Sequence, residues 1–595
     1  MVDDAMELLR SVRDKTDETE FYTPLPKGYR LGQCKYVAVF GTVISGLGKG
    51  IFSSSLAKLL KDKALKVSPI KLEGYLNIDS GTLNPYRHGE VFVLDDGMET
   101  DMDLGTYERM LDQDLARANF LTSGQVFRAV LDKERAGGYL GRDVQMIPHV
   151  TGEVKMRLRE LAAASGADVV FVEVGGTVGD IENAFYIEAL REMAYEEGPG
   201  SMLFVALTYI LRPPSLGEQK SKAAQLGIKR LMEFGIHPDI IACRAEQPVG
   251  EKVRQKIAVY TNVPIERVFS MHDLPSIYLL PSIMREARLD SEVVQCLHLG
   301  GKVNSAADIR AAVQWERFTA RITSPPREVT IGITGKYTAL RDSYASIIKA
   351  LEHAAAANDA HVNVSWIDTT DLSDANVADA LAGCDGIIVP GGFGVRGTGG
   401  KIACVRRARE GRLPYLGICL GFQMAVIEYA RNVCGMADAD STELDPATPT
   451  PVIDILPEQK KIEGLGGNMR LGGQDVDIAP GTLAAELFGG ARRIRQRFRH
   501  RYEVDPKYVP ALETGGLVFS GRHPVHPIMQ VLELPREVHP YFVAAQFHPE
   551  LTSRPLRPQP MFVGLVAAAM KRHHLDGDLP GCVEAVKKVC APAEA

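Results

Sequence analysis

The sequence predicts an α/β protein with two domains, and three observations lead to this prediction. The chain has 595 residues, which is more than a single domain of ordinary size needs. In both halves, short apolar runs alternate with amphipathic helical stretches, as in parallel sheets covered by helices. Between the halves, residues 323–327 (Thr-Ser-Pro-Pro-Arg) form a break, because proline cannot continue a helix and disfavours helical geometry in the residue before it.

These patterns give the domain boundaries and the expected strands. The first domain is expected at residues 35–300, a linker at 301–328 with a helical pattern over 305–321, and the second domain at 329–574. Residues 1–34 and 575–595 are interpreted as an N-terminal extension and a C-terminal tail, and residues 440–467 as an insertion rich in Pro, Asp and Gly. The expected strands are residues 35–40, 67–72, 168–174, 203–208, 240–244, 329–333, 386–390, 414–418 and 541–545.

The composition is that of a folded protein and argues against several classes of partner. Hydrophobic residues make up 45% of the chain and charged residues 24%, close to the averages for soluble globular proteins. With 68 Lys and Arg against 75 Asp and Glu, the net charge of −7 provides no basic field. We therefore expect no nucleic acid and no membrane partner, and any anionic ligand must be held by a local site.

Cysteine usage and the apolar pattern indicate a cytoplasmic location. The nine cysteines are scattered without CxxC pairs, which argues against a disulfide framework or a zinc site and favours a reducing compartment. The first 34 residues lack the apolar core of a secretory signal, and no run of about 18 apolar residues follows elsewhere.

A candidate nucleophile, Cys419, lies in the second half. The apolar run 414–418 leads into Gly417-Ile418-Cys419-Leu420-Gly421 and then into a helical pattern over residues 422–430. Small residues around a sharp strand-to-helix turn expose the side chain between them and leave backbone N–H groups free at the helix start. The start of a helix also favours thiolate over thiol. Taken alone, a cysteine is more often a small buried hydrophobe.

Two further motifs favour the catalytic interpretation of Cys419. Gln546-Phe547-His548-Pro549-Glu550 follows an apolar run and offers a base with a carboxylate to orient it, as Cys-His catalysis requires. Upstream, an apolar strand runs into Pro390-Gly391-Gly392, where backbone amides could form an oxyanion hole.

Together these motifs resemble the class I (triad) glutamine amidotransferase family, over about residues 329–571. The resemblance implies a flavodoxin-like fold in which Cys419 attacks the glutamine amide, His548 is its base and Glu550 orients His548. It implies an oxyanion hole formed by the amides of Gly392 and Leu420. It also implies glutamine-binding roles for Gln423, Glu443 and Arg501, of which the last two, taken singly, could equally be surface charges. The product would be ammonia, which a second reaction must consume.

A glycine-rich loop in the first half is the candidate phosphate site. Residues 41–50 (Gly-Thr-Val-Ile-Ser-Gly-Leu-Gly-Lys-Gly) separate a predicted strand from a helical pattern over 51–61. Such a turn presents backbone N–H groups and a lysine to phosphate. The match to the Walker pattern is incomplete, because Val43 replaces its first glycine and Gly50 its hydroxyl residue. As a lone motif, the loop could equally be a tight turn that packs a helix on a sheet.

Two acids near this loop are candidate magnesium ligands. Glu173 ends the apolar run 168–174, where an unpaired carboxylate is costly, and Asp103 lies in a polar stretch where it could also be a plain surface acid. Mg²⁺ bound with phosphates needs one or two such carboxylates.

With these features in place, the first half resembles the synthetase domain of the CTP synthase family, a P-loop amidoligase with a Rossmann-like parallel sheet, over about residues 35–323. The motifs that carry the resemblance are residues 45–50, 71–72, 88–93, 103–109, 173–182 and 276–278. The resemblance implies that ATP phosphorylates O4 of UTP and that ammonia from glutamine displaces the phosphate at C4 to give CTP, so that the chain is a ligase of pyrimidine biosynthesis. Because protonated ammonia is not nucleophilic, an enclosed passage for it is expected.

The same resemblance implies ligand sites and regulation. Mg²⁺ would be held by Asp103 and Glu173, CTP would be a feedback inhibitor that shares the triphosphate pocket, GTP would be an activator, and the enzyme would be a homotetramer with that pocket between subunits. The residues implied for ATP are Gly46, Leu47, Gly48, Lys49, Gly50, Ile51, Lys71 and Asp103. Those implied for UTP or CTP are Ser45, Asp180, Ile181, Glu182, Lys220, Lys222, Gln225 and Lys256.

The sequence departs from the family pattern at three places, and two alternatives stay open. Glu73-Gly74 replaces Asp-Pro after Lys71-Leu72, and Ala223-Ala224 replaces Pro-Thr after Lys222, which puts nucleotide affinity in question. Gly41-Thr42-Val43 stands where Gly-Gly-Val is common. The first alternative is another glutamine-dependent P-loop amidoligase, for example one acting on a corrinoid carboxylate. The second is a catalytically reduced paralogue that serves as a filament or regulatory subunit.

Overall fold

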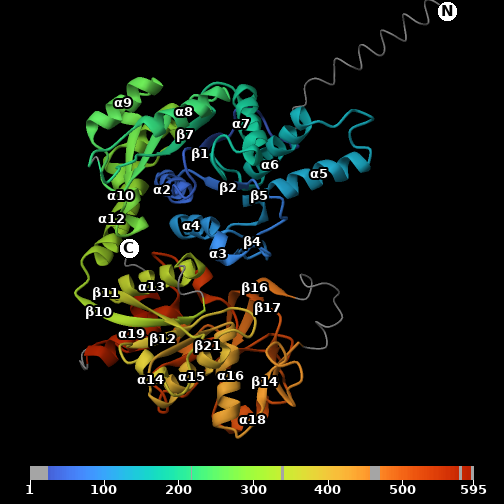
Figure 1. Cartoon of the computed structure of the whole chain (residues 1–595), viewed down its shortest axis with the longest axis vertical. Coiled ribbons are helices and arrows are strands. Elements are labelled where there is room, and N and C mark those ends of the chain that lie inside the picture. Colours follow the sequence, from blue (N-terminus) through green and yellow to red (C-terminus); the bar gives the residue numbers. More distant parts are fainter. Residues whose placement is uncertain (1–24, 216, 337–340, 456–468, 575–578, 591–595) are drawn as a thin grey trace, which may run out of the picture. The chain divides into compact units, whose positions relative to one another are not determined.

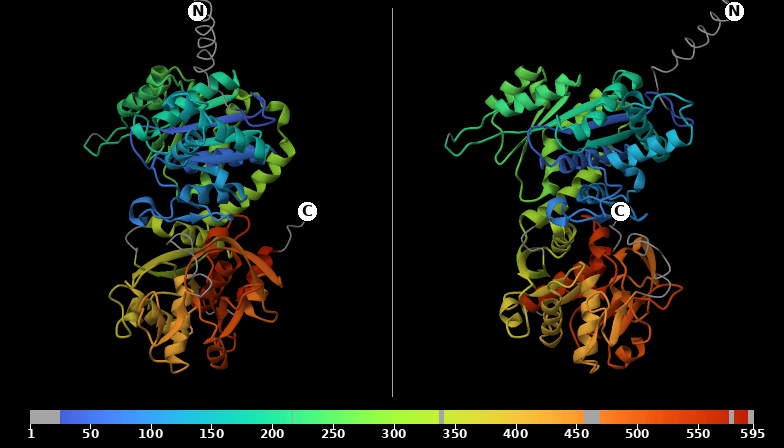
Figure 2. Two further views of the ribbon diagram at one scale, coloured as in Figure 1. Left: turned by 90° about the vertical axis from the view of Figure 1, so that its right-hand side faces the viewer. Right: turned by 45° about the vertical axis from the view of Figure 1, so that its right-hand side comes forward.

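The computed structural model describes residues 25–215, 217–336, 341–455, 469–574 and 579–590. They form two compact units (Figures 1 and 2). The first unit holds the described residues up to Thr82 together with Leu115–Glu316, and the second holds Leu83–Asp114 together with the described residues from Arg317 onward. Most of the predicted N-terminal extension, residues 456–467 of the predicted insertion and parts of the predicted tail lie outside the described residues.

The first unit is built on a seven-stranded sheet in the order β5-β2-β6-β1-β7-β8-β9. Every neighbouring pair of strands in it is parallel, which confirms the predicted sheet. The strands are β1 (Lys35–Gly41), β2 (Val67–Glu73), β5 (Phe120–Thr122), β6 (Val169–Val174), β7 (Met202–Tyr209), β8 (Ile240–Ala245) and β9 (Val268–His272). Five of these seven strands coincide with the apolar runs expected from the sequence.

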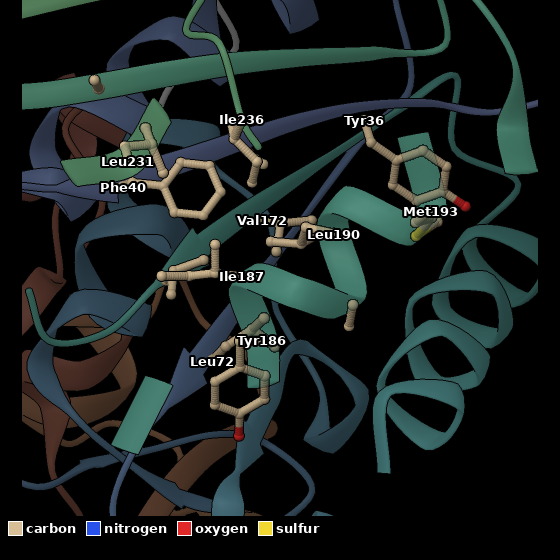
Figure 3. Close-up of a cluster of buried hydrophobic side chains, with 14 of the residues drawn as sticks. Tyr36, Phe40, Leu72, Val172, Tyr186, Ile187, Leu190, Met193, Leu231 and Ile236 are labelled. Carbon is tan, nitrogen blue, oxygen red and sulfur yellow. The ribbon is translucent and has the colours of Figure 1, made fainter. Parts of the chain in front are cut away.

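Helices cover the faces of this sheet, and apolar side chains fill the space between the layers. In Figure 3, Tyr36 and Phe40 of β1 and Val172 of β6 pack with Ile187 and other apolar residues of α7. Full burial of such side chains stabilises the fold by about 1.5–3 kcal/mol each. The main helices are α2 (Lys49–Asp62), α5 (Ser123–Arg135), α6 (Thr151–Ser165), α7 (Ala184–Glu197), α8 (Lys222–Glu233), α9 (Glu251–Thr261), α10 (Leu280–Glu286), α11 (Leu289–Cys296) and α12 (Ser305–Thr323).

The second unit contains a nine-stranded sheet in the order β11-β10-β12-β13-β21-β20-β19-β16-β17. The strands from β11 to β21 are parallel, as predicted, and the remaining neighbours are antiparallel. The strands are β10 (Arg327–Gly335), β11 (Ala360–Asp368), β12 (Gly386–Val389), β13 (Tyr415–Ile418), β16 (Arg470–Ile478), β17 (Arg493–His500), β19 (Val518–Arg522), β20 (Met529–Glu533) and β21 (Phe542–Ala545). The helices are α13 (Ala345–Ala357), α14 (Val377–Ala380), α15 (Thr398–Glu410), α16 (Leu420–Asn432), α17 (Leu483–Leu487), α18 (Val509–Thr514), α19 (Pro560–His574) and α20 (Cys582–Cys590).

Smaller elements complete the second unit. Residues 83–114 contribute α3 (Pro85–His88), the hairpin of β3 (Phe92–Val93) and β4 (Glu99–Thr100), and α4 (Met102–Leu111). The predicted domain 35–300 contains this segment, which by contacts groups with the residues from Arg317 onward. Within the predicted insertion, β14 (Ala439–Ser441) and β15 (Thr450–Asp454) join β18 (Glu503–Val504) in a small sheet.

No helix in the described residues has both the length and the apolar character needed to cross a bilayer.

Candidate active sites

Cys419 lies at a sharp turn between β13 and α16 in the second unit. Its backbone has φ 51° and ψ −100°, a left-handed conformation that costs energy for any residue except glycine. The side chain is buried, and the residue precedes the first turn of α16, where backbone N–H groups have no helical acceptor. The turn therefore holds the thiol at the start of α16, beside N–H groups that have no helical acceptor, but the side chain is buried where the sequence pattern predicted an exposed one.

The two glycines that flank Cys419 are required by close packing. A Cβ atom at Gly421 would lie 2.0 Å from the carbonyl oxygen of Val389. One at Gly417 would lie 2.5 Å from the hydroxyl of Tyr415 and 2.8 Å from Cβ of Ala544. Because neither position can accept a side chain, the Gly-x-Cys-x-Gly pattern follows directly from the geometry of the turn.

His548 and Glu550 follow the end of β21 and form a hydrogen-bonded pair. Nδ1 of His548 lies 2.7 Å from Oε1 of Glu550. Burial of the ring opposes protonation, but the negative charges of Glu550 and Cys419 outweigh it and raise the pKa of His548 to about 10. The imidazole is therefore held in its protonated form near neutral pH, in the cavity that Cys419 also lines.

A cavity of about 140 Å³ joins these groups. Cys419, His548, Glu550 and the Gly391-Gly392 turn all line it, so the structure brings the predicted triad and the predicted oxyanion loop together. A Cβ atom at Gly391 would lie 3.0 Å from Cε1 of His548, which explains the small residue there. The remaining lining residues are Glu90, Val91, Ser343, Tyr344, Ile347, Pro390, Phe393, Arg499 and Leu551.

The predicted glutamine-binding residues lie around the cavity rather than in its wall. Gln423 donates from Nε2 to the carbonyl of Tyr502 at 3.0 Å, and Glu443 accepts from the N–H of Gly394 at 2.8 Å. Arg501 follows the end of β17. Gln423 and Glu443 therefore support loops next to the cavity, and none of the three is among the residues that line it.

Several residues near Cys419 were not predicted from the sequence. Nε2 of Gln546 and the carbonyl oxygen of Arg499 each lie 3.7 Å from Sγ of Cys419. Lys401 of α15 is buried and donates from Nζ to the carbonyl of Pro390 at 2.8 Å. Burial lowers the pKa of Lys401 to about 7, with a further contribution from Lys336. Gln546 stands two residues before His548, and that proximity was the available signal.

The glycine-rich loop connects β1 to α2 in the first unit. Gly46, Gly48 and Val43 all adopt positive φ angles, and the value of 73° at Val43 is unfavourable for a β-branched residue. Lys49 opens α2 and donates from Nζ to the carbonyl of Gly176 at 2.9 Å. Val43 thus adopts a backbone conformation that favours glycine, and strain of this kind is typical of functional loops.

Lys71 and Glu173 form a buried ion pair at the carboxyl edge of the sheet. Nζ of Lys71 lies 2.7 Å from Oε1 of Glu173 and 3.3 Å from Oε1 of Glu73. β6, which carries Glu173, lies between β2 and β1 in the sheet, next to the strand that leads into the glycine loop. Ligands of open parallel sheets bind at this edge. Lys49, Lys71 and Glu173 are therefore at the part of the fold where a nucleotide would bind.

The replacements at Glu73 and Gly74 fit this edge. A Cβ atom at Gly74 would lie 3.0 Å from Cβ of Glu182, and one at Gly175 would lie 2.8 Å from Oε2 of Glu73. Asp180 accepts from the N–H of Thr177 at 2.9 Å. The segment Asp180-Ile181-Glu182 therefore packs directly beside the altered Lys71–Gly74 strand end.

The basic residues implied for the triphosphate lie on and near two adjacent helices. Lys222 and Gln225 are on α8 and Lys256 is on α9, and Nζ of Lys222 lies 5.6 Å from the ring centre of Tyr260 of α9. Lys220 precedes α8 and pairs with Glu218.

Helix α8 also contacts the glycine loop. A Cβ atom at Gly227 of α8 would lie 2.9 Å from side-chain carbons of Thr42 and Val43. The implied UTP residues on α8 thus belong to a helix that packs on the candidate phosphate loop.

Asp103 is on α4 and belongs to the second unit, whereas Glu173 belongs to the first. Among the described residues, no group of three or more His, Cys, Asp or Glu side chains is arranged to hold a metal ion.

The two halves of the chain define a class of enzyme, a ligase that takes its nitrogen from glutamine. Residues 339–568 match the family described as "Glutamine amidotransferase class-I", and residues 35–299 match the one described as "CTP synthase N-terminus". Two archaeal relatives align along nearly the whole chain. A CTP synthase of Thermococcus gammatolerans is 48% identical over 541 residues, 91% of this chain and 99% of the relative. One of Pyrococcus furiosus is 48% identical over 536 residues, 90% and 98% of the two chains.

A solved glutaminase domain of the Trypanosoma brucei CTPS, with bound acivicin, is 36% identical and has a TM-score of 0.39, covering 42% of this chain and 96% of that one. The chain belongs to the CTP synthase family. Its reaction is the glutamine-dependent conversion of UTP to CTP, and the matches favour neither of the two alternatives.

Proposed function

We propose that the described side chains divide the reaction between the two units, with Cys419, His548 and Glu550 hydrolysing glutamine in the second. The thiolate of Cys419 attacks the amide carbon of glutamine, and the imidazolium of His548 gives its proton to the leaving nitrogen, which departs as NH₃. His548 then takes a proton from water as the oxygen of that water attacks the thioester. Glutamate leaves, and the thiolate and imidazolium are restored.

The groups around the triad have supporting roles. N–H groups of Gly392 and Leu420 stabilise the oxyanion formed at each attack, and Gln423, Glu443 and Arg501 shape the site for glutamine. The observation that carries this proposal is the cavity lined jointly by Cys419, His548, Glu550 and Gly392, because the reacting groups and the oxyanion loop face the same space.

The first unit performs the phosphorylation of UTP. Lys49 and Lys71 balance charge on the phosphates of ATP, together with the loop that runs from Gly46 to Ile51. Glu173 is a Mg²⁺ ligand, since it is a buried carboxylate at the ligand-binding edge of the sheet, and the resemblance adds Asp103 as a second. Bound Mg²⁺ would neutralise charge on the phosphate oxygens.

The triphosphate of UTP binds Ser45, Lys220, Lys222, Gln225 and Lys256 through charge-assisted hydrogen bonds, and the feedback inhibitor CTP uses the same contacts. Asp180, Ile181 and Glu182 lie near the pyrimidine ring. The enzyme works in the cytoplasm as a homotetramer that nucleotides favour and GTP activates. These assignments rest on the resemblance and on the placement of α8 against the glycine loop.

One assay tests the proposal as a whole. The purified full chain is supplied with ATP, Mg²⁺, glutamine and each pyrimidine triphosphate in turn, and CTP and glutamate are measured. We expect CTP from UTP alone, with one glutamate for each CTP, and loss of CTP when a chelator removes Mg²⁺. No CTP from UTP under the complete conditions, or CTP formed at an unchanged rate after the chelator removes Mg²⁺, would contradict the proposal.

A further inference from the structure

One face of β17 carries a row of four arginines. Residues two apart in a strand point to the same side, so the side chains of Arg493, Arg495, Arg497 and Arg499 share a face. Each is paired with an acid. Arg493 pairs with Asp477 at 2.6 Å, and Arg495 with Asp95 at 2.8 Å. Arg497 pairs with Glu108 at 2.7 Å, and Arg499 with Glu99 at 2.7 Å.

Three of these four acids come from residues 83–114, and two of the pairs are largely shielded from water, with Arg499 and Glu99 17% and 9% exposed. The side chains of Arg497 and Glu108 are 2% and 0% exposed, and the guanidinium binds both carboxylate oxygens. A second buried arginine, Arg554, donates to the same carboxylate at 2.7 Å. Arg495 and Asp95, by contrast, are 53% and 39% exposed. The ion pairs that strongly constrain their side chains are thus those of Arg497 and Arg499, which we call the inner pairs.

The inner arginines are directly connected to the catalytic groups. The carbonyl of Arg497 accepts from the N–H of His548 at 2.8 Å. The carbonyl of Arg499 is the acceptor 3.7 Å from Sγ of Cys419. Arg554 lies four residues after Glu550, two residues beyond the end of the short helical turn Pro549–Thr552 that contains Glu550. Fixing these three guanidinium groups therefore fixes the backbone on which the catalytic residues stand.

The same segment also forms part of the cavity wall. Glu90 and Val91 line the cavity together with Cys419 and His548. Oε1 and Oε2 of Glu90 accept from the N–H of Ser346 at 3.0 and 2.9 Å, which attaches this part of the wall to the start of α13. Residues 83–114 are therefore in contact with the glutaminase site through charged pairs and through the cavity itself.

We propose that Glu99 and Glu108 are positioning residues of the glutaminase, acting through Arg499, Arg497 and Arg554 on Cys419 and His548. This inference rests on the proposed role of Cys419. Residues 83–114, which lie within the segment that matches the CTP synthase N-terminus, would then complete the geometry of the glutaminase site.

The test compares three neutral variants of the full chain. Glu99→Gln and Glu108→Gln remove charge from the shielded pairs while keeping the shape of the side chain. Asp95→Asn does the same at the exposed pair on the same strand and is the matched control. For each variant, kcat and KM for glutamine, the pH dependence of alkylation of Cys419 by iodoacetamide, and the melting temperature are measured. Cys419→Ala is assayed in parallel.

For both inner variants we expect kcat for glutamine to fall by about tenfold or more with little change in KM, because small displacements of reacting groups slow the chemical step. The pH profile of alkylation should shift, since the thiolate loses its fixed imidazolium neighbour. Asp95→Asn should keep wild-type values. If Glu108→Gln does not fold, Glu99→Gln alone decides.

Two results would overturn the inference. One is a folded Glu99→Gln enzyme with wild-type kcat and alkylation profile, whatever its melting temperature. The other is an equal loss in Asp95→Asn, which would indicate a general effect of charge. Glutamine hydrolysis that survives in Cys419→Ala would instead contradict the proposed function itself, so the two failures are distinguishable.

Discussion

Replacing Glu550 by Gln should show how much of glutamine hydrolysis depends on the charge beside His548. The carboxylate lies 2.7 Å from Nδ1 of the ring, in a buried site. At an effective dielectric constant of about 20 and a charge separation of about 4 Å, the attraction is roughly 4 kcal/mol. Its loss would lower the pKa of His548 by about three, since one pKa unit corresponds to about 1.4 kcal/mol.

The sign of the effect follows from the raised pKa. With a pKa of about 10, His548 stays protonated across the neutral range and can donate to the leaving nitrogen. In Glu550→Gln the protonated fraction should fall as pH rises through about 7, and the neutral ring is also free to adopt the wrong tautomer. We expect kcat for glutamine hydrolysis to fall by about 10²–10⁴.

The assay measures glutamate release against pH in wild type and variant, with CTP synthesis from ammonium as the control for the first unit. The high-pH limb of the variant should move down by several units while ammonium-dependent synthesis is kept. A variant with the wild-type rate and the wild-type pH profile would refute the role given to Glu550.

Three further substitutions test the other parts of the account. Lys49→Ala should abolish CTP formation from glutamine and from ammonium but leave basal glutamine hydrolysis; normal ammonium-dependent synthesis would mean that the glycine loop is only structural. Lys222→Ala should raise the UTP requirement and the CTP inhibition constant by similar factors, about tenfold or more, from the loss of one charge-assisted hydrogen bond. A change in only one of these constants, or in neither, would exclude the shared pocket. Light scattering would show whether UTP still promotes tetramers of the variant at the concentration that suffices for wild type, which we expect it not to do. Lys401→Met should slow glutamine hydrolysis about tenfold, because the carbonyl of Pro390 loses its hydrogen-bond donor. Lys401→Arg, which keeps a positively charged donor, is the control. An unchanged rate in Lys401→Met would show that Lys401 does not support the oxyanion loop.

Local patterns allowed much of the fold and the triad to be predicted from the sequence. The apolar runs at β1 and β13 end at glycine turns, so strand, turn and helix could be recognised without long-range information. Cys419, His548 and Glu550 could be grouped because each follows an apolar strand, and parallel strands bring their carboxyl ends to one edge of the sheet.

Features that depend on distant partners could not be predicted. The sequence of β17, Arg-Ile-Arg-Gln-Arg-Phe-Arg-His, has the charge pattern of a surface strand, yet Arg497 is buried because Glu108 and Asp114 neutralise it. No spacing rule joins positions 108 and 497. Residues 83–114 likewise lie within the predicted domain 35–300, whereas by contacts they group with the residues from Arg317 onward.

The left-handed backbone of Val43 was also beyond prediction. Valine disfavours this conformation, and nothing in the local sequence indicates the φ angle of 73° that Val43 adopts beside Gly227 of α8.

The central claim is that one chain contains a glutaminase centred on Cys419 and a separate synthetase that uses its ammonia. The most direct test is CTP formation by Cys419→Ala from UTP and ATP with either glutamine or ammonium as the nitrogen source, at a pH high enough to supply NH₃. The account predicts no CTP from glutamine and near wild-type synthesis from ammonium. Equal loss with both nitrogen sources, or CTP formation from glutamine without the thiol, would contradict it.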